Sequence, residues 1–259
     1  MEIPLHRPLQ VSFQTARSSC VCSEGAELAT VDTADINTFI GSRIQDFSWI
    51  GGNDLLVEGN YSWTDGTAWS YTNWRFNAPN NGNGNSEQDC VVVRTDGEWD
   101  DVACHTARNF VCQKPAAGQS GLSANTACDC QAGWTASFDT GFCYKRGEAK
   151  ADYDTAKAAC EADSSDLASV TSETENLVVH SVLTADGNNN NGWLGATDTT
   201  TDGTWVWDDT STWSYENWWT TSALGTAGGT VQNCVQMRWS DTTWDDIKCT
   251  ASKWFVCKK

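Results

Sequence analysis

The spacing of apolar and polar positions predicts two helices followed by short strands, once in each half of the chain. Small and apolar residues recur at helical spacing at Phe13, Ala16, Ser19 and Cys20, and again at Tyr153, Ala156, Ala159 and Cys160. A second helical stretch follows in each half: ADINTFIGSRI (34–44), and ETENLVVHSVL (173–183) with Thr171 or Ser172 as its N-cap. Short apolar runs between Gly, Asn and Asp residues, such as DCVVVRT (89–95) and NFVCQK (109–114), predict strands. Two helices followed by several antiparallel strands predict an α+β fold, present twice.

An internal duplication explains why the pattern occurs twice. The stretch WIGGNDLLVEGNYSWTDGTAWSYTNW (49–74) aligns without gaps with WLGATDTTTDGTWVWDDTSTWSYENW (193–218), at an offset of 144 positions. The identical positions in the first copy include Trp49, Gly51, Asp54, Gly59, Trp63, Trp69, Tyr71, Asn73 and Trp74. The same offset relates Cys90 to Cys234, and one inserted residue then relates Cys104 to Cys249 and Cys112 to Cys257. Each copy has the size of one domain.

The stretch between the copies predicts the domain boundaries. PAAGQSGLSANTA (115–127) is small and polar and has the composition of a linker. We therefore expect a first domain at 1–114 and a second domain at 128–259.

The charge of the chain narrows the choice of partners. The 259 residues carry a formal net charge of −18 at pH 7, with 39% hydrophobic residues and 15 Trp, a globular composition. Such a chain repels nucleic acids and anionic membranes and favours cations. Calcium is the expected cofactor, because it takes oxygen ligands from Asp, Glu, Asn and Gln. No segment is apolar over a transmembrane length, so we expect no membrane insertion.

Twelve cysteines and only three His point to disulfides rather than to a zinc site. Disulfides need an oxidising compartment, so we expect a secreted, extracellular protein. The start of the chain, MEIPLHRPLQ, lacks the apolar stretch of a signal peptide. Either the signal has been removed or the natural chain begins elsewhere.

Together these motifs resemble the C-type lectin-like domain. In each copy a helix with a Cys is followed by WIGG or WLGA, then a polar loop, then Cys–WDD–Cys and a final FVC. The resemblance implies two tandem α+β domains stabilised by disulfides. The implied pairs are Cys20–Cys112 and Cys90–Cys104, Cys160–Cys257 and Cys234–Cys249, and Cys143 with Cys128 or Cys130. The second domain has the long-form N-terminal hairpin, CDCQAGWTASFDTGFCYK (128–145), whereas the corresponding first strand of the first domain has no counterpart in the sequence.

Two cysteines then remain, Cys22 and one of Cys128 and Cys130. We expect them to bond to each other, tying the first helix of domain 1 to the start of domain 2, with Cys128 as the partner if Cys130 pairs with Cys143. The alternative is a free or intermolecular Cys22.

The resemblance places a ligand loop at NAPNNGNGNSEQDC (77–90). Lectins of this family carry Glu-Pro-Asn or Gln-Pro-Asp around a cis proline, and Trp-Asn-Asp on a later strand, for calcium and sugar hydroxyls. This chain has Ala78-Pro79-Asn80, then Glu87 or Gln88, and Trp99-Asp100-Asp101, so one ligand is missing and an amide donor has become a carboxylate. The residues implied for sugar are Asn80, Glu87 and Asp100. Those implied for calcium at this primary site are Asn80, Gln88, Asp100 and Asp101.

The family's auxiliary calcium site matches better. Asp54 and Glu58 occupy its acidic pair, and Asn81 and Asp89 its loop positions; the alternative is a set of ordinary surface acids. In the second domain Asp198 and Asp202 repeat the acidic pair. Its loop lacks proline, however, and Gln232 and Asn233 precede the cysteine. Sugar binding by the family mechanism is therefore expected mainly in domain 1.

The remaining motifs complete the functional expectation. Asn60-Tyr61-Ser62 is an N-glycosylation sequon. The Trp residues of the second domain are expected mainly in its core, although Trp218 and Trp219 could form a stacking platform. No catalytic motif occurs, so an enzyme is not expected. We expect a secreted, calcium-dependent lectin that binds glycans or glycoproteins; the alternative is a structural or extracellular-matrix protein that contacts protein, mineral or ice.

Overall fold

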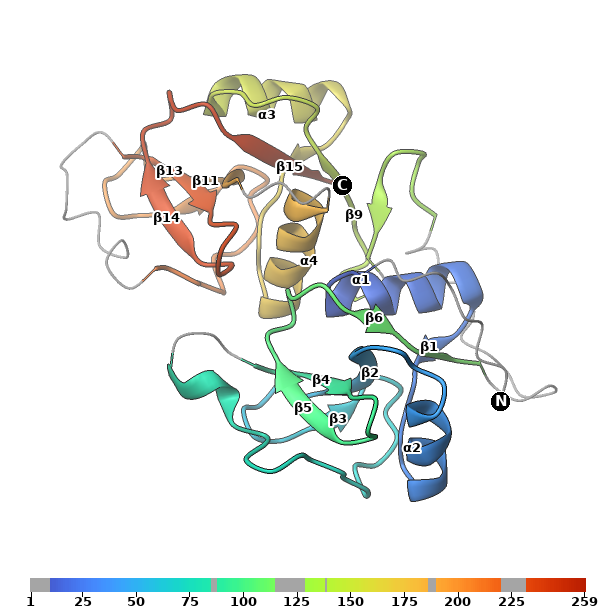
Figure 1. Ribbon diagram of the computed structural model, residues 1–259. Coiled ribbons are helices and arrows are strands. Elements are labelled where there is room, and N and C mark those ends of the chain that lie inside the picture. The colour runs from blue at the N-terminus through green and yellow to red at the C-terminus, as the bar shows by residue number, and fades with distance from the viewer. Residues whose placement is uncertain (1–9, 85–87, 115–128, 138, 186–189, 220–231) are drawn as a thin grey trace. The chain divides into compact units, whose positions relative to one another are not determined.

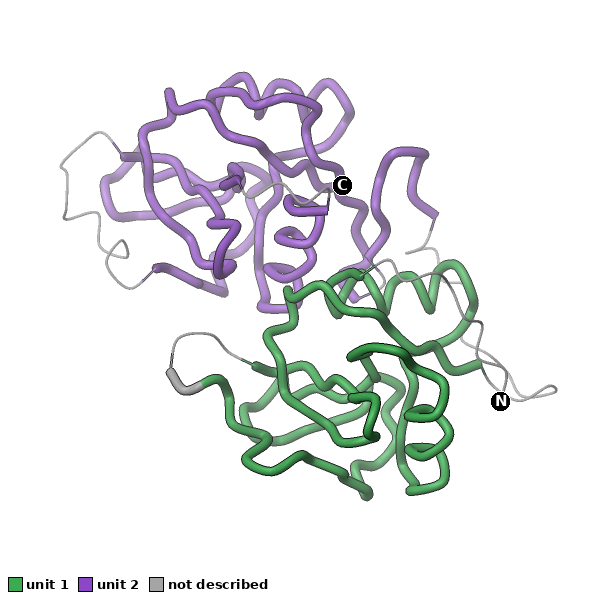
Figure 2. The backbone as a smooth tube through the Cα atoms, in the orientation of Figure 1, with its two compact units in different colours: residues 1–128 green, residues 129–259 purple. Residues whose placement is uncertain are grey.

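The chain forms two compact units, Met1–Cys128 and Asp129–Lys259 (Figure 2). The computed structural model describes residues 10–84, 88–114, 129–137, 139–185, 190–219 and 232–259. The expected linker, 115–127, lies outside these ranges. Each unit is α+β, as the sequence predicts, and each is called by its number below (unit 1 and unit 2).

Unit 1 combines two α-helices with one larger and one smaller sheet (Figure 1). Its elements are α1 (Phe13–Ser18), the π-type turn η1 (Ser19–Ser23), β1 (Glu27–Leu28), α2 (Ala34–Gly41), β2 (Ser48–Asn53), β3 (Ser62–Trp63), the short helix η2 (Asn81–Gly84), β4 (Cys90–Val93), β5 (Trp99–Val102), β6 (Asn109–Phe110) and β7 (Cys112–Gln113). The larger sheet has the order β3-β2-β4-β5, with β6 also pairing with β2, and β1 pairs with β7. This order places the end of β2 beside the start of β4, where the ligand loop ends.

Unit 2 repeats this plan and adds a hairpin. Its elements are β8 (Thr135–Ala136), β9 (Cys143–Arg146), α3 (Tyr153–Ala162), β10 (Asp166–Leu167), α4 (Glu173–Thr184), β11 (Gly192–Thr197), β12 (Val206–Trp207), β13 (Cys234–Met237), β14 (Trp244–Ile247) and β15 (Trp254–Lys258). The sheet order is β14-β13-β11-β15-β9-β8. Strands β8 and β9 form the N-terminal hairpin expected for the long form. The sheets are antiparallel, as expected, apart from two pairs: β2 with β6, and β11 with β15, pair in parallel.

The helices begin where their sequences provide a cap. Ser12, Thr33, Asp152 and Ser172 each accept a hydrogen bond from the backbone N–H three residues later, at the start of α1, α2, α3 and α4. Ser172, rather than Thr171, therefore caps α4. In α3 the buried residues are Tyr153, Ala156 and Cys160, which share one face of the helix. Ala159 is exposed, because it lies outside this buried face.

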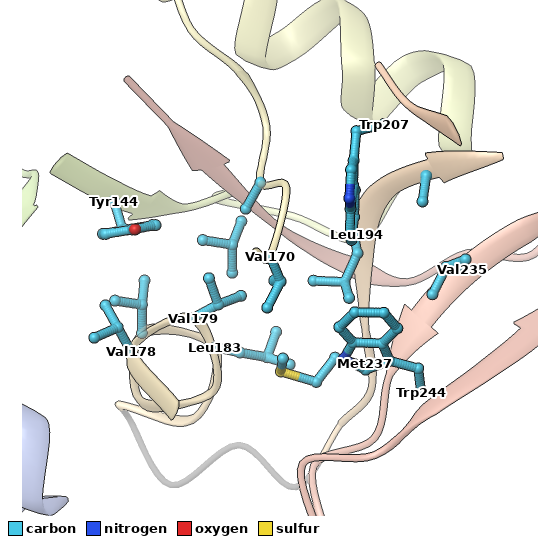
Figure 3. Close-up of a cluster of buried hydrophobic side chains, with 14 residues drawn as sticks. Tyr144, Val170, Val178, Val179, Leu183, Leu194, Trp207, Val235, Met237 and Trp244 are labelled. Carbon is cyan, nitrogen blue, oxygen red and sulfur yellow. The ribbon is translucent and has the colours of Figure 1, made fainter. Parts of the chain in front are cut away.

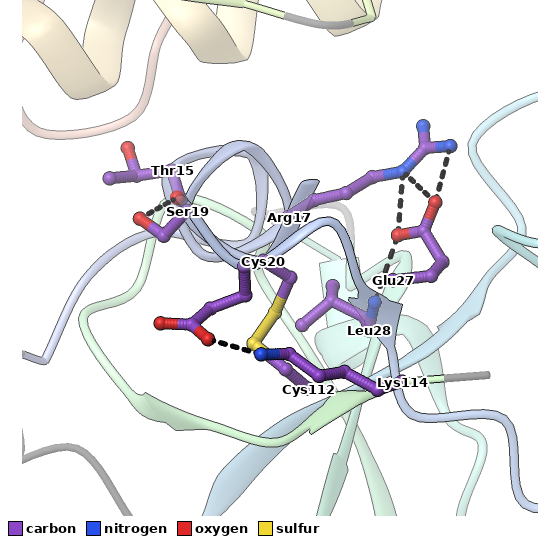
Figure 4. Close-up of a disulfide and its surroundings, with 9 residues drawn as sticks. Thr15, Arg17, Ser19, Cys20, Glu27, Leu28, Cys112 and Lys114 are labelled. Atoms are coloured by element: carbon purple, nitrogen blue, oxygen red, sulfur yellow. Dashed lines mark hydrogen bonds and ion pairs between the residues drawn. A yellow bond between two sulfur atoms is a disulfide. The ribbon is translucent and has the colours of Figure 1, made fainter. Parts of the chain in front are cut away.

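Five disulfides join described cysteines, and they are the pairs that the resemblance implies. They are Cys20–Cys112, Cys90–Cys104, Cys130–Cys143, Cys160–Cys257 and Cys234–Cys249. The first fastens η1 to β7, beside the ion pairs Arg17–Glu27 and Glu24–Lys114 (Figure 4). Cys22 is also disulfide-bonded, and its expected partner, Cys128, lies outside the described residues.

The two cores are built around equivalent tryptophans. Trp99 of unit 1 contacts the rings of Trp63, Trp69, Tyr71 and Trp74, and Trp244 of unit 2 contacts those of Trp207, Trp213, Tyr215 and Trp218. Each central indole N–H donates to an asparagine on the second helix of its unit, Asn37 or Asn176, at 2.7 and 2.8 Å. Figure 3 shows Trp207 and Trp244 with Leu194, Val235 and Met237 in the core of unit 2.

Unit 2 also buries an ion pair that its hairpin helps to enclose. Lys258 Nζ lies 2.6 Å from Glu175 Oε1, and both side chains are almost fully buried. The Tyr144 hydroxyl, from β9, donates to the same carboxylate at 2.8 Å, so the charges are hydrogen-bonded as well as paired. In unit 1 the position aligned with Lys258 is Gln113, whose amide oxygen accepts from the N–H of Thr30.

Candidate functional site

The segment that leads into the ligand loop of unit 1 is anchored by the backbone of β5 at Trp99. The N–H of Trp99 donates to the carbonyl of Asn73 at 2.8 Å, and the N–H of Arg75 donates to the carbonyl of Trp99 at 2.9 Å. The Ala78–Pro79 peptide bond is cis. Downstream, the loop enters β4 at Cys90, which the disulfide to Cys104 holds in place.

A buried carboxylate on β5 ties the tip of the loop to the sheet. Asp101 is 1% exposed, and its Oδ2 accepts hydrogen bonds from the N–H groups of Asn80 and Asn81 at 2.8 and 2.6 Å. Asn81 Oδ1 in turn accepts from the N–H of Gln88 at 2.6 Å. The loop segments on either side of the undescribed residues 85–87 are therefore held together, whereas the predicted ligand Glu87 lies outside the described residues.

A second buried carboxylate approaches from the end of β2. Asp54 is 4% exposed, and its Oδ2 accepts from the N–H of Gly59 at 2.8 Å. The backbone N–H of Asp54 donates to the carbonyl of Asp89 at 3.0 Å, which joins this turn to the last loop residue before β4. Asp89 is also buried, whereas Glu58 is exposed.

The acids of unit 1 act electrostatically on the same two groups, Asp54 and Tyr61. Burial raises the pKa of Asp54 to about 6; the N–H of Gly59 opposes the shift, and the charges of Glu58 and Asp101 add to it. The hydroxyl of Tyr61 has its pKa raised by burial and then by the charges of Asp54, Asp101, Glu58 and Asp89. The four predicted acidic residues thus act on one point in unit 1.

Two oxygens of this cluster have the environment that a hard cation suits. Asp54 Oδ1 and Asp101 Oδ1 are buried and accept no hydrogen bond within the described part of the chain. Buried carboxylate oxygens without donors are natural calcium ligands, so these residues fit the ion that the auxiliary site implies. Among the described residues, however, no three Asp, Glu, His or Cys side chains form a ready-made metal cluster.

The primary calcium position of the resemblance does not fit in the same way. Ala78 offers no side-chain oxygen, and Asn80 Oδ1 already accepts from the N–H of Gly82 at 3.1 Å. Asp100 Oδ2 forms an ion pair with Arg75 Nε at 2.7 Å. A guanidinium therefore lies against the carboxylate that the sequence analysis assigned to calcium and sugar. Arg75 was not among the predicted site residues, because no motif distinguishes an arginine that follows Trp74.

Unit 2 keeps part of the acidic pair. Asp198 is 2% exposed, and its Oδ2 accepts from the N–H of Gly203 at 2.8 Å, as Asp54 accepts from Gly59. Burial, then the charges of Asp245 and Asp198, raise the pKa of Asp246. Asn233 stands where unit 1 has Asp89, so this cluster has one carboxylate fewer. The loop that precedes it, 220–231, lies outside the described residues.

The tryptophans of unit 2 divide between core and surface. Trp207 is buried, and Trp205, Trp213 and Trp218 pack against the core. Trp219 is 40% exposed, with the guanidinium of Arg238 4.2 Å from its ring centre. The alternative of a paired Trp218 and Trp219 platform is therefore wrong for Trp218, whose ring packs against Trp205, Trp213 and Trp244.

Comparison with known families decides the family. Residues 9–114 and 149–259 both match the model described as "Lectin C-type domain". The chain belongs to the C-type lectin domain family. Its two matches correspond to the duplicated halves, and the tandem arrangement and lectin fold expected from the sequence are confirmed.

Named relatives of this C-type lectin domain protein include receptors and small lectins. It is 28% identical over 259 residues to C-type mannose receptor 2 of Rattus norvegicus, covering 96% of this chain but 17% of the receptor. It is 40% identical over 114 residues to Lectin BRA-3 of Megabalanus rosa, covering 42% of this chain and 68% of that protein. The chain thus spans 17% of the length of the receptor, whose whole-protein activity cannot be transferred.

Solved structures similar to one half of the C-type lectin chain include an antifreeze protein and a lectin. One is a calcium-independent type II antifreeze protein, 29% identical with a TM-score of 0.44, covering 50% of this chain and 93% of that chain. Another is the C-type lectin CEL-I from Cucumaria echinata, 24% identical with a TM-score of 0.47, covering 50% of this chain and 96% of that chain.

Proposed function

We propose that this protein is an extracellular, calcium-dependent glycan-binding protein whose ligand loop is residues 77–90 of unit 1. The observation that carries the proposal is the pair of buried oxygens Asp54 Oδ1 and Asp101 Oδ1, which accept no hydrogen bond from a described residue, on two carboxylates close enough for the charge of Asp101 to help raise the pKa of Asp54. C-type lectin domains are generally calcium-binding, and the lectin relatives support recognition of glycans or glycoproteins.

The residues proposed to hold calcium come from three segments of unit 1. They are Asp54 and Glu58 after β2, Asn81, Gln88 and Asp89 in the loop, and Asp101 on β5. Bound calcium would neutralise carboxylates that otherwise repel one another. The chain's own contribution is to hold the loop: Asp101 already accepts from two backbone N–H groups there. In unit 2, Asp198 and Asp202 are proposed as a weaker site, because Asn233 replaces a carboxylate.

The sugar-contacting surface proposed here is the exposed part of the loop. Asn80 is exposed; its Oδ1 accepts from Gly82 and its Nδ2 donates to the carbonyl of Asn77 at 3.0 Å, which leaves one N–H and one lone pair of the amide for hydroxyl groups. Glu87 and Asp100 remain the other proposed contacts. Asp100, however, forms an ion pair with Arg75 through Oδ2, and its buried Oδ1 accepts no hydrogen bond from a described residue, so a sugar contact there requires a rearrangement of the Asp100 side chain.

Cysteine use supports an extracellular location. None of the described cysteines is free, and such extensive disulfide bonding requires an oxidising compartment. No helix in the described ranges has both the length and the apolar character needed to cross a membrane. Asn60 is exposed and remains a proposed glycosylation site. We assign no catalytic step, nucleic-acid partner or membrane insertion to the protein.

A second function, as a structural or extracellular-matrix protein, is favoured by one specific observation. The primary ligand position has lost an oxygen at Ala78, and Asp100 is paired with Arg75. Under this alternative, calcium stiffens the loops of unit 1, and the exposed surface contacts protein, mineral or ice rather than sugar.

A glycan array with the full chain separates the two functions. We expect binding in millimolar calcium that is lost in chelator and in the Asp54→Asn/Asp101→Asn variant. Asp65→Asn is the matched control, because Asp65 is an exposed acid of the same unit whose turn hydrogen bond to Thr67 an asparagine can keep. Absence of glycan binding together with a calcium-dependent rise in Tm would favour the structural alternative. Neither glycan binding nor a calcium response would contradict both.

A further inference from the structure

The charge around Asp100 differs between the two units. In unit 1, Arg75 Nε lies 2.7 Å from Asp100 Oδ2, with the side chains 32% and 14% exposed. Arg75 Nη1 also donates to the carbonyl of Phe76 at 3.3 Å, so the guanidinium is held on two sides. In unit 2 the position aligned with Arg75 is Trp219, and Asp245 accepts from the neutral amide of Gln236 at 3.1 Å. An arginine at this position therefore occurs in unit 1, which has the proline loop, and not in unit 2.

The surroundings of Arg75 keep it in this position. Its backbone N–H donates to the carbonyl of Trp99, and its carbonyl accepts from the N–H of Ala78 at 3.1 Å, so the residue is fixed between β5 and the cis peptide. The ion pair raises the pKa of the guanidinium, which is charged at every accessible pH. A permanent positive charge therefore lies where the ligand loop meets β5.

We propose that the Arg75 guanidinium takes the place of a calcium ion at the primary position of unit 1, so that the loop holds one calcium, at the Asp54–Asp101 cluster. Asp100 Oδ1 is buried and accepts no hydrogen bond from a described residue, so the carboxylate has one oxygen without a donor. Charge nevertheless opposes an ion there, because a divalent ion on Asp100 would approach the guanidinium at short range in a partly buried environment. The missing oxygen at Ala78 lowers the ion's affinity further.

This arrangement changes what the loop recognises. Without an ion at the primary position, a pair of sugar hydroxyls is not chelated there. Contact comes instead from N–H donors of Arg75 and the Asn80 amide, which favour acceptor groups on the ligand. This consequence rests on the proposed function, whereas the calcium count does not depend on any glycan.

The first test restores the missing ligand and counts calcium bound per full chain, by equilibrium dialysis with metal analysis. Ala78→Glu alone is expected to bind the same number of calcium ions as the wild type. Ala78→Glu/Arg75→Gln is expected to bind one more, and Ala78→Glu/Arg75→Lys no more than the wild type, because lysine keeps the charge. Ala78→Glu/Arg43→Gln, which removes an exposed arginine of the same unit, is the matched control and should also gain none.

Two results would overturn the inference: an extra ion in Ala78→Glu alone, or no extra ion in Ala78→Glu/Arg75→Gln. If no glycan binds on the array, the number of calcium ions bound per chain is unaffected. Failure of the proposed function can therefore be distinguished from failure of this inference.

A double-mutant cycle provides a second measurement that needs no gain of binding. Arg75→Gln should lower Tm by a few degrees because it leaves Asp100 without its partner, and Asp100→Asn in the same chain should recover most of that loss. The coupling between the two substitutions should be the same in chelator and in millimolar calcium. A coupling present in chelator but abolished by calcium would mean that the ion displaces Arg75, and would contradict the inference.

Discussion

Asp54 shows how one residue can make calcium binding sensitive to pH. Its pKa is raised to about 6, chiefly by burial. In chelator, the native state therefore keeps this proton when the unfolded chain has lost it. The free energy of unfolding should consequently decrease as pH rises from about 4 to about 6, and the contribution should be constant above that range.

Calcium binding should release this proton. We expect close to zero protons released per calcium at pH 7.5, and up to about one from Asp54 at pH 5, where affinity falls by up to about tenfold per pH unit. Isothermal titration calorimetry in buffers of different ionisation enthalpy measures the release. Asp65→Asn should behave as the wild type. A proton release that does not change between pH 7.5 and pH 5 would contradict the assignment.

At the scale of elements, the duplication provides pairs of equivalent positions that differ in how well they tolerate a larger side chain. Gly51 in β2 and Gly195 in β11 are equivalent, and both strands are buried against a neighbouring strand. A Cβ on Gly195 would lie 2.5 Å from the carbonyl oxygen of Leu167, whereas one on Gly51 would first meet the Thr64 hydroxyl at 2.7 Å, a side chain that can turn away. The backbone obstacle is the harder one to move.

Gly195→Ala should therefore destabilise unit 2 more than Gly51→Ala destabilises unit 1. Shifting packed backbone costs about 1–3 kcal/mol, and we expect Gly195→Ala to lie in the upper part of that range. Urea unfolding, with hydrogen exchange to assign each loss to its unit, measures the difference. Equal losses of unfolding free energy in the two units would show that the backbone of β10 moves as easily as the Thr64 side chain.

Sequence reasoning recovered the elements best where the signal is local or repeated. The cap at Ser172 and the Trp frame could be predicted because local spacing and duplication carry them, and the cysteine pairs because the family resemblance implies them. The parallel pairing of β2 with β6 could not, because it joins residues about 60 positions apart without a sequence pattern of its own. Arg75 was missed for a similar reason: its role depends on Asp100 lying beside it on another segment. Residue type alone also could not reveal that Asp101 holds the loop through one oxygen and leaves the other without a donor.

At the scale of the whole molecule, two units share a scaffold but differ in their loops. The central tryptophan, its asparagine partner and two disulfides occur in both. Arg75, Ala78 and Asp89 lie in or beside the ligand loop of unit 1, and unit 2 has other residue types at the aligned positions. The family's binding function is therefore proposed mainly for unit 1.

The cysteines allow a prediction about the connection of the chain. Cys22 is disulfide-bonded, and the other ten described cysteines pair with one another. Non-reducing peptide mapping should therefore recover a peptide containing Cys22 linked to one containing Cys128 of the same chain, and reduction should separate them. A Cys22 thiol that alkylates without reduction, or a Cys22-linked dimer, would contradict this pairing.

The aromatic frame has an optical consequence. Trp63 and Trp69 lie 4.5 Å apart between ring centres, and Trp207 and Trp213 lie 4.7 Å apart, so their excited states should couple and produce a circular-dichroism couplet. In unit 1, Trp74 belongs to the same frame and directly precedes Arg75. Rearrangement of the loop should therefore change indole emission without any attached dye, with the equivalent frame of unit 2 as an internal reference.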